Sequence, residues 1–331
     1  LLKSLKADAT ISDDILFNGD AVKWRKYANS LKVRILMRQS AKKDVSADIA
    51  AIFNNAQEYP VFTSIDDQAT LVYNNTVDFY KWYIQPKNLP SDGSGVIFGD
   101  NFRVSEAIVD ALQTKDDPRL PVYVAPTKHS FEAHRANASV PFVYRGQPAG
   151  LSAAEQNEID KDDYSVLSSM IRSESRAFVM TFAELQFLKA EAIIRGMITG
   201  NAADEYAKGI RASMQKWAAI SSDDVDVYLA RPDVALNTAQ NEALKQIGTQ
   251  AWIDSFLNGF EAFANWRRTG YPELKVGTSV SSAIPVRYIY SDNEQNNPNL
   301  ISWTNEKIGR MVNETDMVWF QPQKWNTNVN R

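Results

Sequence analysis

Residues 241–272 read NEALKQIGTQAWIDSFLNGFEAFANWRRTGYP and predict two consecutive helices. Apolar side chains recur at helical spacing up to Trp252 and again from Phe256, and the Asn-Gly pair between the two runs favours a short turn. The second helix has a well-specified end, because two arginines complement its carbonyl groups, Gly270 suits the left-handed conformation and Pro272 prevents a further turn.

The closing motif of this stretch, WRRTGYP, is predicted to be structural. Trp266 should be largely buried, so that its removal would act as a large truncation of the core. Arg267 or Arg268 should make contacts inside the protein rather than face a ligand.

Two further helix pairs are predicted upstream, near residues 20–58 and 176–218, in addition to the pair at 241–268. In residues 21–38 the apolar side chains form a continuous stripe along one helical face, and residues 44–58 supply the partner helix. Three pairs of similar length, with small residues where helices would touch, predict a mainly α fold of stacked tetratricopeptide-like helix hairpins.

Two segments lack this regular pattern. Residues 60–175 are rich in prolines and aspartate turns, with good helical periodicity only at 104–112, and they predict a long irregular insertion. Because long loops in compact proteins are commonly functional, and the aromatic residues here argue against disorder, the insertion is the place to look for a site. Residues 272–331 predict an irregular C-terminal part.

An aromatic cluster in the insertion is the candidate ligand-binding site. Residues 73–83 read YNNTVDFYKWY, with five aromatic and three amide or carboxylate side chains. Sugars stack their apolar ring faces on aromatic side chains, while planar polar groups bind the hydroxyls. The candidate ligand-binding residues are Tyr73, Asn74, Asp78, Tyr80, Trp82 and Tyr83. In the alternative interpretation, some of these rings only anchor the insertion to the helices.

Four stretches, in order along the chain, resemble the SusD/RagB family. They are residues 18–38 (NGDAVKWRKYANSLKVRILMR), 176–195 (RAFVMTFAELQFLKAEAIIR), 250–272 (QAWIDSFLNGFEAFANWRRTGYP) and 284–299 (IPVRYIYSDNEQNNPN). Members of that family are outer-membrane lipoproteins of Bacteroidetes that capture nutrients, usually glycans, for a TonB-dependent transporter. The resemblance implies a single SusD-like domain over residues 1–331.

The resemblance also implies a function and a location. We expect a surface-exposed lipoprotein of the cell outer membrane that binds oligosaccharides and delivers them to a SusC-like TonB-dependent transporter. Family members usually extend further at the N-terminus, so the sequence is expected to lack an N-terminal portion, with the signal peptide and the lipid anchor upstream. The anchor would be the protein's only link to the membrane, and no cofactor is expected.

Two alternative functions are kept. Some relatives serve peptide uptake, and stacked helix pairs have concave faces that suit extended chains, so a peptide-binding surface protein of the same architecture is possible.

A glycoside hydrolase is the weaker alternative. Glu184 and Glu191 lie seven residues apart on one helix, a spacing that could hold a catalytic pair, but pairing with a neighbouring helix explains them better. With no nucleophile elbow or phosphate-binding glycine loop, the sequence predicts a protein that is not an enzyme.

Composition excludes several other classes. The net charge of -4, with 36 basic residues scattered among 40 acidic ones, offers no field for nucleic acid. No cysteine is present, so disulfides and thiolate metal sites are excluded.

His129 and His134 match no metal-binding frame and are expected to face solvent. The oxygen-rich residues 292–299 could hold calcium, but a self-bonded loop is the better interpretation, and no metal site is predicted.

Overall fold

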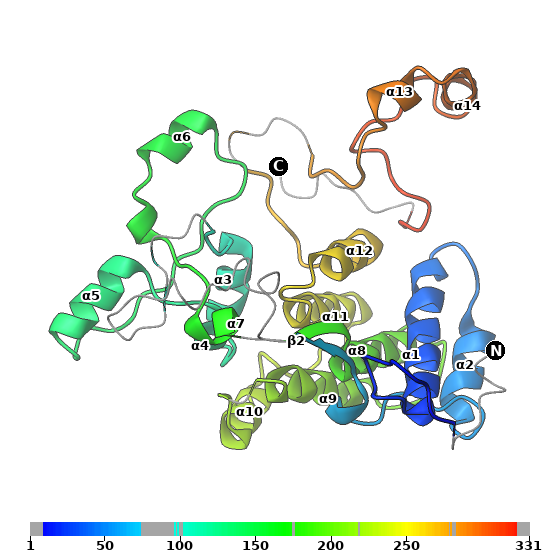
Figure 1. Ribbon diagram of the computed structural model, residues 1–331, viewed down its shortest axis with the longest axis horizontal. Coiled ribbons are helices and arrows are strands. Elements are labelled where there is room, and N and C mark those ends of the chain that lie inside the picture. The colour runs from blue at the N-terminus through cyan, green and yellow to red at the C-terminus, as the bar shows by residue number, and fades with distance from the viewer. Residues whose placement is uncertain are drawn as a thin grey trace.

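The structure is a computed structural model that describes residues 9–73, 96, 98, 102–173, 176–217, 219–277, 279 and 283–322, and it is mainly helical (Figure 1). Its described helices are α1 (Ala21–Gln39), α2 (Ser46–Asn54), α3 (Glu106–Gln113), α4 (Leu120–Tyr123), α5 (Lys128–Ala136), α6 (Ala153–Glu158), α7 (Ser169–Ser173), α8 (Phe182–Ile194), α9 (Ala202–Gln215), α10 (Ser222–Leu229), α11 (Gln240–Asp254), α12 (Gly259–Thr269), α13 (Asp292–Gln295) and α14 (Pro298–Lys307). Short 3-10 turns follow α2 and α6, at Ile65–Asp67 and Lys161–Asp163.

Helix α8 is the centre of the fold, and it packs against α9, α11 and α1. It is apolar on most of its surface because neighbours cover it on several sides. The contact with α9 is especially close at Gly209, where a Cβ atom would lie 2.6 Å from the ring of Phe187. Side chains of α8 contribute to two apolar clusters, one with α1 and α2 and one with α3, α9 and α11. The predicted stacking of helix hairpins is thus confirmed.

The WRRTGYP closure is confirmed in detail. Helix α12 ends at a left-handed Gly270 with φ of 79°, whose N–H donates to the carbonyl of Trp266. Trp266 is 4% exposed, and its indole N–H donates to the carbonyl of Pro272. Arg267 donates to the carbonyl of Val286, and Arg268 forms a buried ion pair, so both arginines are engaged inside the protein.

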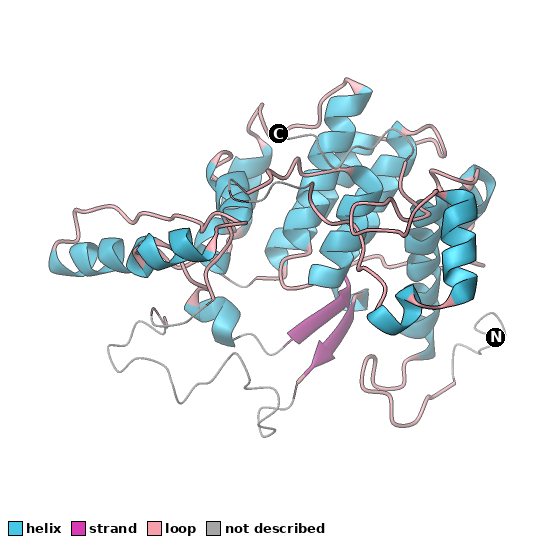
Figure 2. Cartoon of the chain, turned by 90° about the horizontal axis from the view of Figure 1, so that it is seen from above, coloured by secondary structure: helices cyan, strands magenta, loops and turns pink. Residues whose placement is uncertain are grey.

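The only sheet among the described residues is a two-stranded antiparallel ribbon of β1 (Ala69–Val72) and β2 (Arg176–Met180). Figure 2 shows the ribbon at the edge of the helical body. Helical periodicity is expected from Phe178 onward, but Phe178 lies opposite Thr70 in the ribbon, and α8 begins only after Thr181. The reason is local, since the Thr181 hydroxyl accepts a hydrogen bond from the N–H of Glu184 and caps the helix there.

The irregular segments contain more helix than the sequence predicts. Helices α4 to α7 lie in residues 60–175, α10 follows the second pair, and α13 and α14 lie in the C-terminal part. These helices have 4 to 10 residues, too few for a clear periodic pattern, and their boundaries depend on caps such as the Ser152–Glu155 capping box. Helix α2 is also shorter than the predicted partner at 44–58.

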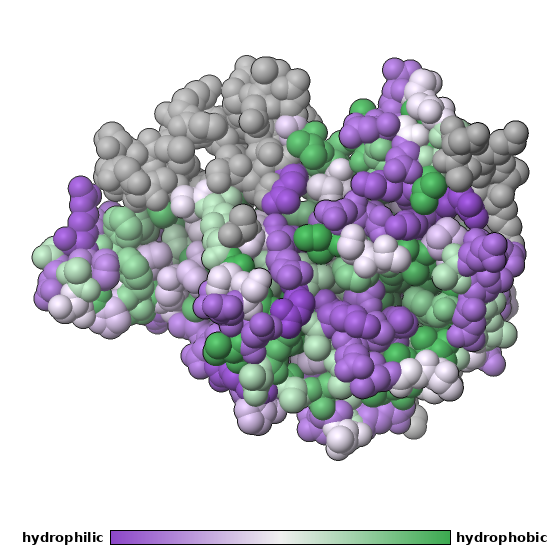
Figure 3. Space-filling view, turned by 90° about the horizontal axis from the view of Figure 1, so that it is seen from below, coloured by the Kyte–Doolittle hydropathy of each residue, from purple (hydrophilic) through white to green (hydrophobic). Residues whose placement is uncertain are grey.

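Among the residues that the structure describes, no helix combines the length and the apolar character needed to cross a bilayer. On the face seen in Figure 3, hydrophobic residues are scattered among hydrophilic ones. Scattered apolar residues of this kind are ordinary for a folded surface.

Candidate functional site

The predicted ligand-binding residues begin where strand β1 ends. Tyr73 directly follows this strand and is exposed, as is Val72 before it. Asn74, Asp78, Tyr80, Trp82 and Tyr83 lie outside the described residues. What the structure does describe is the base from which their segment departs, the β1–β2 ribbon and its attachment to the helices.

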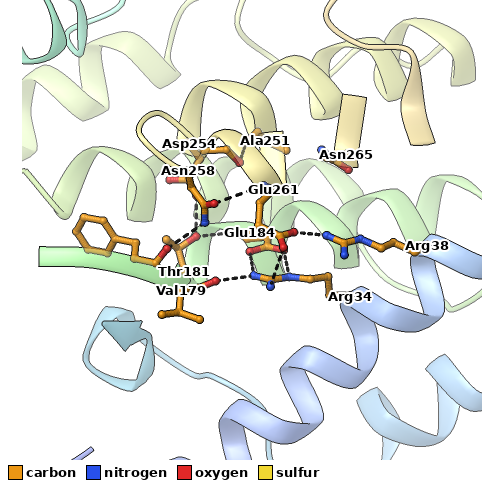
Figure 4. Close-up of polar contacts among 12 residues, drawn as sticks. Arg34, Arg38, Val179, Thr181, Glu184, Ala251, Asp254, Asn258, Glu261 and Asn265 are labelled. Atoms are coloured by element: carbon orange, nitrogen blue, oxygen red, sulfur yellow. Dashed lines mark hydrogen bonds and ion pairs between the residues drawn. The ribbon is translucent and has the colours of Figure 1, made fainter. Parts of the chain in front are cut away.

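Three helices hold the ribbon, two through its backbone carbonyls and one through the side chain of the residue that follows it (Figure 4). Arg34 of α1 donates to the carbonyl of Val179 at 3.0 Å. Asn258, the cap of α12, donates to the carbonyl of Phe178 at 3.1 Å. Thr181, which follows the ribbon, donates its hydroxyl proton to Asp254 of α11 at 2.6 Å. The ribbon is therefore fixed at the point where α1, α11 and α12 meet.

A buried lysine completes this attachment. Lys216, just after α9, contacts the Asp254 carboxylate at 2.7 Å, and the side chains are 1% and 3% exposed. Arg176 at the start of β2 donates to the Lys216 carbonyl and lies over the Phe178 ring. Burial acts to raise the pKa of Asp254, but Lys216 and hydrogen bonds lower it overall. Burial lowers the pKa of Lys216, although the Asp254 carboxylate opposes that shift.

Glu184 of α8 lies in a second charged cluster. Arg34 contacts both oxygens of Glu184 at 2.5 Å and one oxygen of Glu261 at 3.5 Å, and Arg38 contacts Glu261 as well. Burial and the neighbouring Glu261 carboxylate raise the pKa of Glu184, although Arg34 opposes this shift. The cluster joins α1, α8 and α12, which confirms the interpretation that Glu184 pairs with a neighbouring helix.

Glu191 is likewise engaged in ion pairs. Arg268 of α12 contacts its two oxygens at 2.6 and 2.7 Å, and Arg195 contacts it at 2.8 Å. Burial alone would raise the pKa of Glu191, but the two guanidinium groups lower it to about 2. Glu191 is buried with both oxygens on Arg268, and both oxygens of Glu184 are bound by Arg34. The two carboxylates therefore serve as partners in ion pairs between helices, which is the interpretation that the sequence favours over a hydrolase pair.

The Glu191 ion pairs predict a loss of stability in acid. The pKa of Glu191 in the fold, about 2, lies below its ordinary value of 4.5, so its contribution is complete above about pH 4.5 and is lost as the pH falls toward 2. Urea unfolding across this range should show a falling free energy of unfolding, with a shallower fall in Glu191→Gln. Glu158→Gln, a change at an exposed position of α6, should keep the wild-type slope. Equal slopes in all three proteins would contradict the assignment of this acid sensitivity to the Glu191 ion pairs.

The two histidines both make hydrogen bonds within the protein. His129 is exposed and hydrogen-bonds Asp160 at 2.9 Å, which raises the pKa of His129. His134 is half-buried, because its Nδ1 lies 2.6 Å from the carbonyl of Val140, so the expectation of a solvent-facing ring is wrong for this residue. Asp163 also comes near the His129–Asp160 pair.

The oxygen-rich segment 292–299 bonds to itself. The Asn296 amide donates to the carbonyl of Asp292, and the Asn297 amide donates to the Glu294 carboxylate. The Asn297 side chain also caps α14 by accepting from the N–H of Asn299. These contacts support the interpretation of residues 292–299 as a self-bonded loop.

A large groove, which the sequence does not reveal, lies beside α3 and α11. It has a volume of about 1080 Å³ and is open to solvent. Residues of α3 and α11 line it together with residues 232–235, 272–277 and 283–285. Because these segments are far apart in sequence, no local motif marks the groove.

Comparisons with known proteins agree on one family. A model of the SusD-like proteins, described as "Starch-binding associating with outer membrane", matches residues 2–291. An outer-membrane protein of Bacteroides vulgatus described in connection with nutrient binding has 25% identity and a TM-score of 0.75, with 97% of this chain and 71% of that chain covered. A SusD homologue of Bacteroides fragilis has 25% identity and a TM-score of 0.73, with 95% and 71% covered.

A third solved structure adds a named ligand. It is described as a chitin-binding protein and has 29% identity and a TM-score of 0.74, with 94% of this chain and 67% of that chain covered. No curated protein sequence matches the chain.

Proposed function

Because the chain belongs to the SusD-like family, we propose that it binds oligosaccharides at the cell surface and delivers them to a TonB-dependent outer-membrane transporter. The family match over residues 2–291 carries this proposal, and the similarity to a chitin-binding protein supports a glycan as the ligand. The matched family is described by starch binding and a matched structure by chitin binding, and the chain is accordingly a binding protein rather than an enzyme. The description of the family also associates its members with the outer membrane.

The proposed site is the aromatic segment that leaves the β1–β2 ribbon. Its residues are Tyr73, Asn74, Asp78, Tyr80, Trp82 and Tyr83. Rings would stack on sugar faces, and Asn74 and Asp78 would orient the hydroxyls. The firm attachment of the ribbon to three helices supports this proposal, because a binding segment needs a rigid base to hold its contacts in place.

A glycan array, screened in parallel with a peptide library, tests the ligand class. We expect binding to at least one class of oligosaccharide, with no release of reducing sugar during incubation. Binding to peptides alone would replace the proposal with a peptide-uptake function, and release of reducing sugar would show a hydrolase.

The aromatic residues are expected to be used for binding rather than for folding. Trp82→Ala or Tyr80→Ala should weaken binding of the best oligosaccharide by ~1 to 3 kcal/mol, as for aromatic residues that dominate an interface, and should leave the melting temperature nearly unchanged. Titration calorimetry and thermal melting measure the two quantities side by side. A large loss of melting temperature with unchanged affinity would show that these rings anchor the loop.

The transporter partner and the surface location are proposed from the family. A protein that captures a nutrient without transporting it must pass the ligand to a protein that crosses the membrane. Purification of the tagged protein from native outer membranes should therefore recover a TonB-dependent transporter in stoichiometric amount. Repeated recovery of the protein without such a partner would contradict this part of the proposal.

A further inference from the structure

The groove beside α3 and α11 exposes more apolar than polar surface. Ala107 and Ala111 lie one turn apart on α3, and Leu274, Val276 and Ile284 also line the groove. Of the three aromatic residues that line it, Trp252 is half-buried, whereas Tyr206 and Tyr228 are 3% and 2% exposed. A sugar would gain few ring faces here and would press hydroxyls against aliphatic groups, which costs free energy when their hydrogen bonds to water are lost. The groove therefore suits apolar side chains better than a sugar.

Carboxylates outnumber lysines in the lining of the groove. Two of its lysines are neutralised, Lys245 by Glu273 at 2.6 Å and Lys115 by Asp233 at 3.3 Å. The remaining lining carboxylates have no ion-pair partner among the described residues; they are Glu106, Asp110 and Glu242. Of the lysines that line the groove, Lys275 alone has no ion-pair partner among the described residues. Three carboxylates against one ammonium group favour a ligand with positive charge.

The acidic and apolar features form parallel rows on α3. Glu106 and Asp110 are four residues apart, and so are Ala107 and Ala111, so each pair lies along one line of the helix surface. The small alanine side chains leave room for a chain to approach the helix. A ligand that lies along α3 would thus meet carboxylates on one edge and apolar surface beside them.

The size of the groove is compatible with a chain segment. Sites for small molecules usually enclose about 300 to 1,000 Å³. At about 1080 Å³ and open to solvent, this groove lies at the upper end of that range and has room for several residues of an extended chain.

We propose that the groove lined by α3, α11 and residues 272–277 and 283–285 is a docking site for an extended segment of a partner protein that carries apolar side chains together with lysine or arginine. The apolar residues lie over Ala107, Ala111 and Trp252, and the basic residues face Glu106, Asp110 and Glu242. None of these lining residues belongs to the proposed sugar-binding set, so the two proposals can fail independently.

The test uses the whole chain and two fluorescent nonapeptides. One contains leucine and valine with two lysines, and the other replaces both lysines with glutamate. We expect saturable binding of the lysine peptide, seen by fluorescence anisotropy, at least tenfold tighter than that of the glutamate peptide. Affinity for the lysine peptide should fall as salt is added. Equal affinity for the two peptides, or no binding of either one, would overturn the proposal.

Matched variants locate the interaction. The triple variant Glu106→Gln, Asp110→Asn, Glu242→Gln should weaken binding of the lysine peptide at least tenfold. The control triple variant Glu132→Gln, Asp48→Asn, Glu158→Gln has the same change in net charge at exposed positions outside the groove lining, and it should bind like the wild type. An equal loss in both triple variants would show general attraction to an acidic protein and would overturn the assignment to the groove.

A steric variant and two competitors complete the test. Ala107→Trp fills the groove from the wall of α3 and should block the lysine peptide while the melting temperature stays near that of the wild type. Unimpaired binding by Ala107→Trp would contradict the site. Displacement of the peptide by an oligosaccharide from the array would instead make the groove a sugar site. Self-association that Ala107→Trp abolishes would make it an interface between two copies of the chain, and either result would overturn the proposal.

Discussion

Trp266→Ala should lower the free energy of unfolding by ~3 to 5 kcal/mol, as large truncations in a core do. The Trp266 side chain is 4% exposed, stacks near Phe263 with ring centroids 6.1 Å apart, and donates its N–H to the Pro272 carbonyl. Its removal would leave a cavity and an unpaired carbonyl where the chain turns away from α12. Urea unfolding measures the change directly.

The control for this prediction is a tryptophan of the same chain that lies at the surface. Trp303, in α14, is 49% exposed, and Trp303→Ala should change the free energy of unfolding by less than about 1 kcal/mol. Similar effects of the two substitutions would contradict the view that the WRRTGYP closure is part of the core.

Lys216→Met should cost ~3 to 5 kcal/mol, because it leaves the Asp254 carboxylate in the interior without its cation. Methionine keeps most of the volume of the lysine stem, so the loss would come from charge rather than from a cavity. The ammonium group also lies over the rings of Phe178 and Trp217, at 5.1 and 5.5 Å, and these contacts would be lost too. Chemical denaturation again gives the free energy.

Two further variants separate the charge effect from other causes. Lys208→Met removes a lysine whose side chain is 56% exposed and should cost less than about 1 kcal/mol. Adding Asp254→Leu to Lys216→Met removes the unpaired carboxylate and should recover part of the loss. If the double variant were less stable than the two single changes together predict, the buried pair would not be the source of the effect.

The longer, paired helices and the closure of α12 could be predicted from the sequence because their signals are local, whereas the short helices in the irregular segments could not. Gly270, Pro272 and the apolar face before Trp266 act within a few residues of one another. The β1–β2 ribbon carries no such signal, since its strands have only 4 and 5 residues and neither alternates between buried and exposed positions. Its strand character comes from pairing between segments more than 100 residues apart.

The ion pairs that support the candidate site could not be predicted for the same reason. Arg34 and Glu184 are separated by 150 residues, and Glu191 and Arg268 by 77, so only the packing of α1, α8 and α12 brings them together. The aromatic segment 73–83 could be identified as a candidate site from composition alone, because sugar-binding surfaces have a recognisable mixture of rings and planar polar groups. The groove could not be identified, since its walls come from segments with ordinary compositions.

Calorimetric titration of the strongest oligosaccharide from the array into this chain decides whether the protein binds glycans. We expect saturable binding at one site, with the sugar recovered uncleaved afterwards. The contradictory result is a protein that melts cooperatively, and is therefore folded, yet shows no saturable heat with any oligosaccharide on the array.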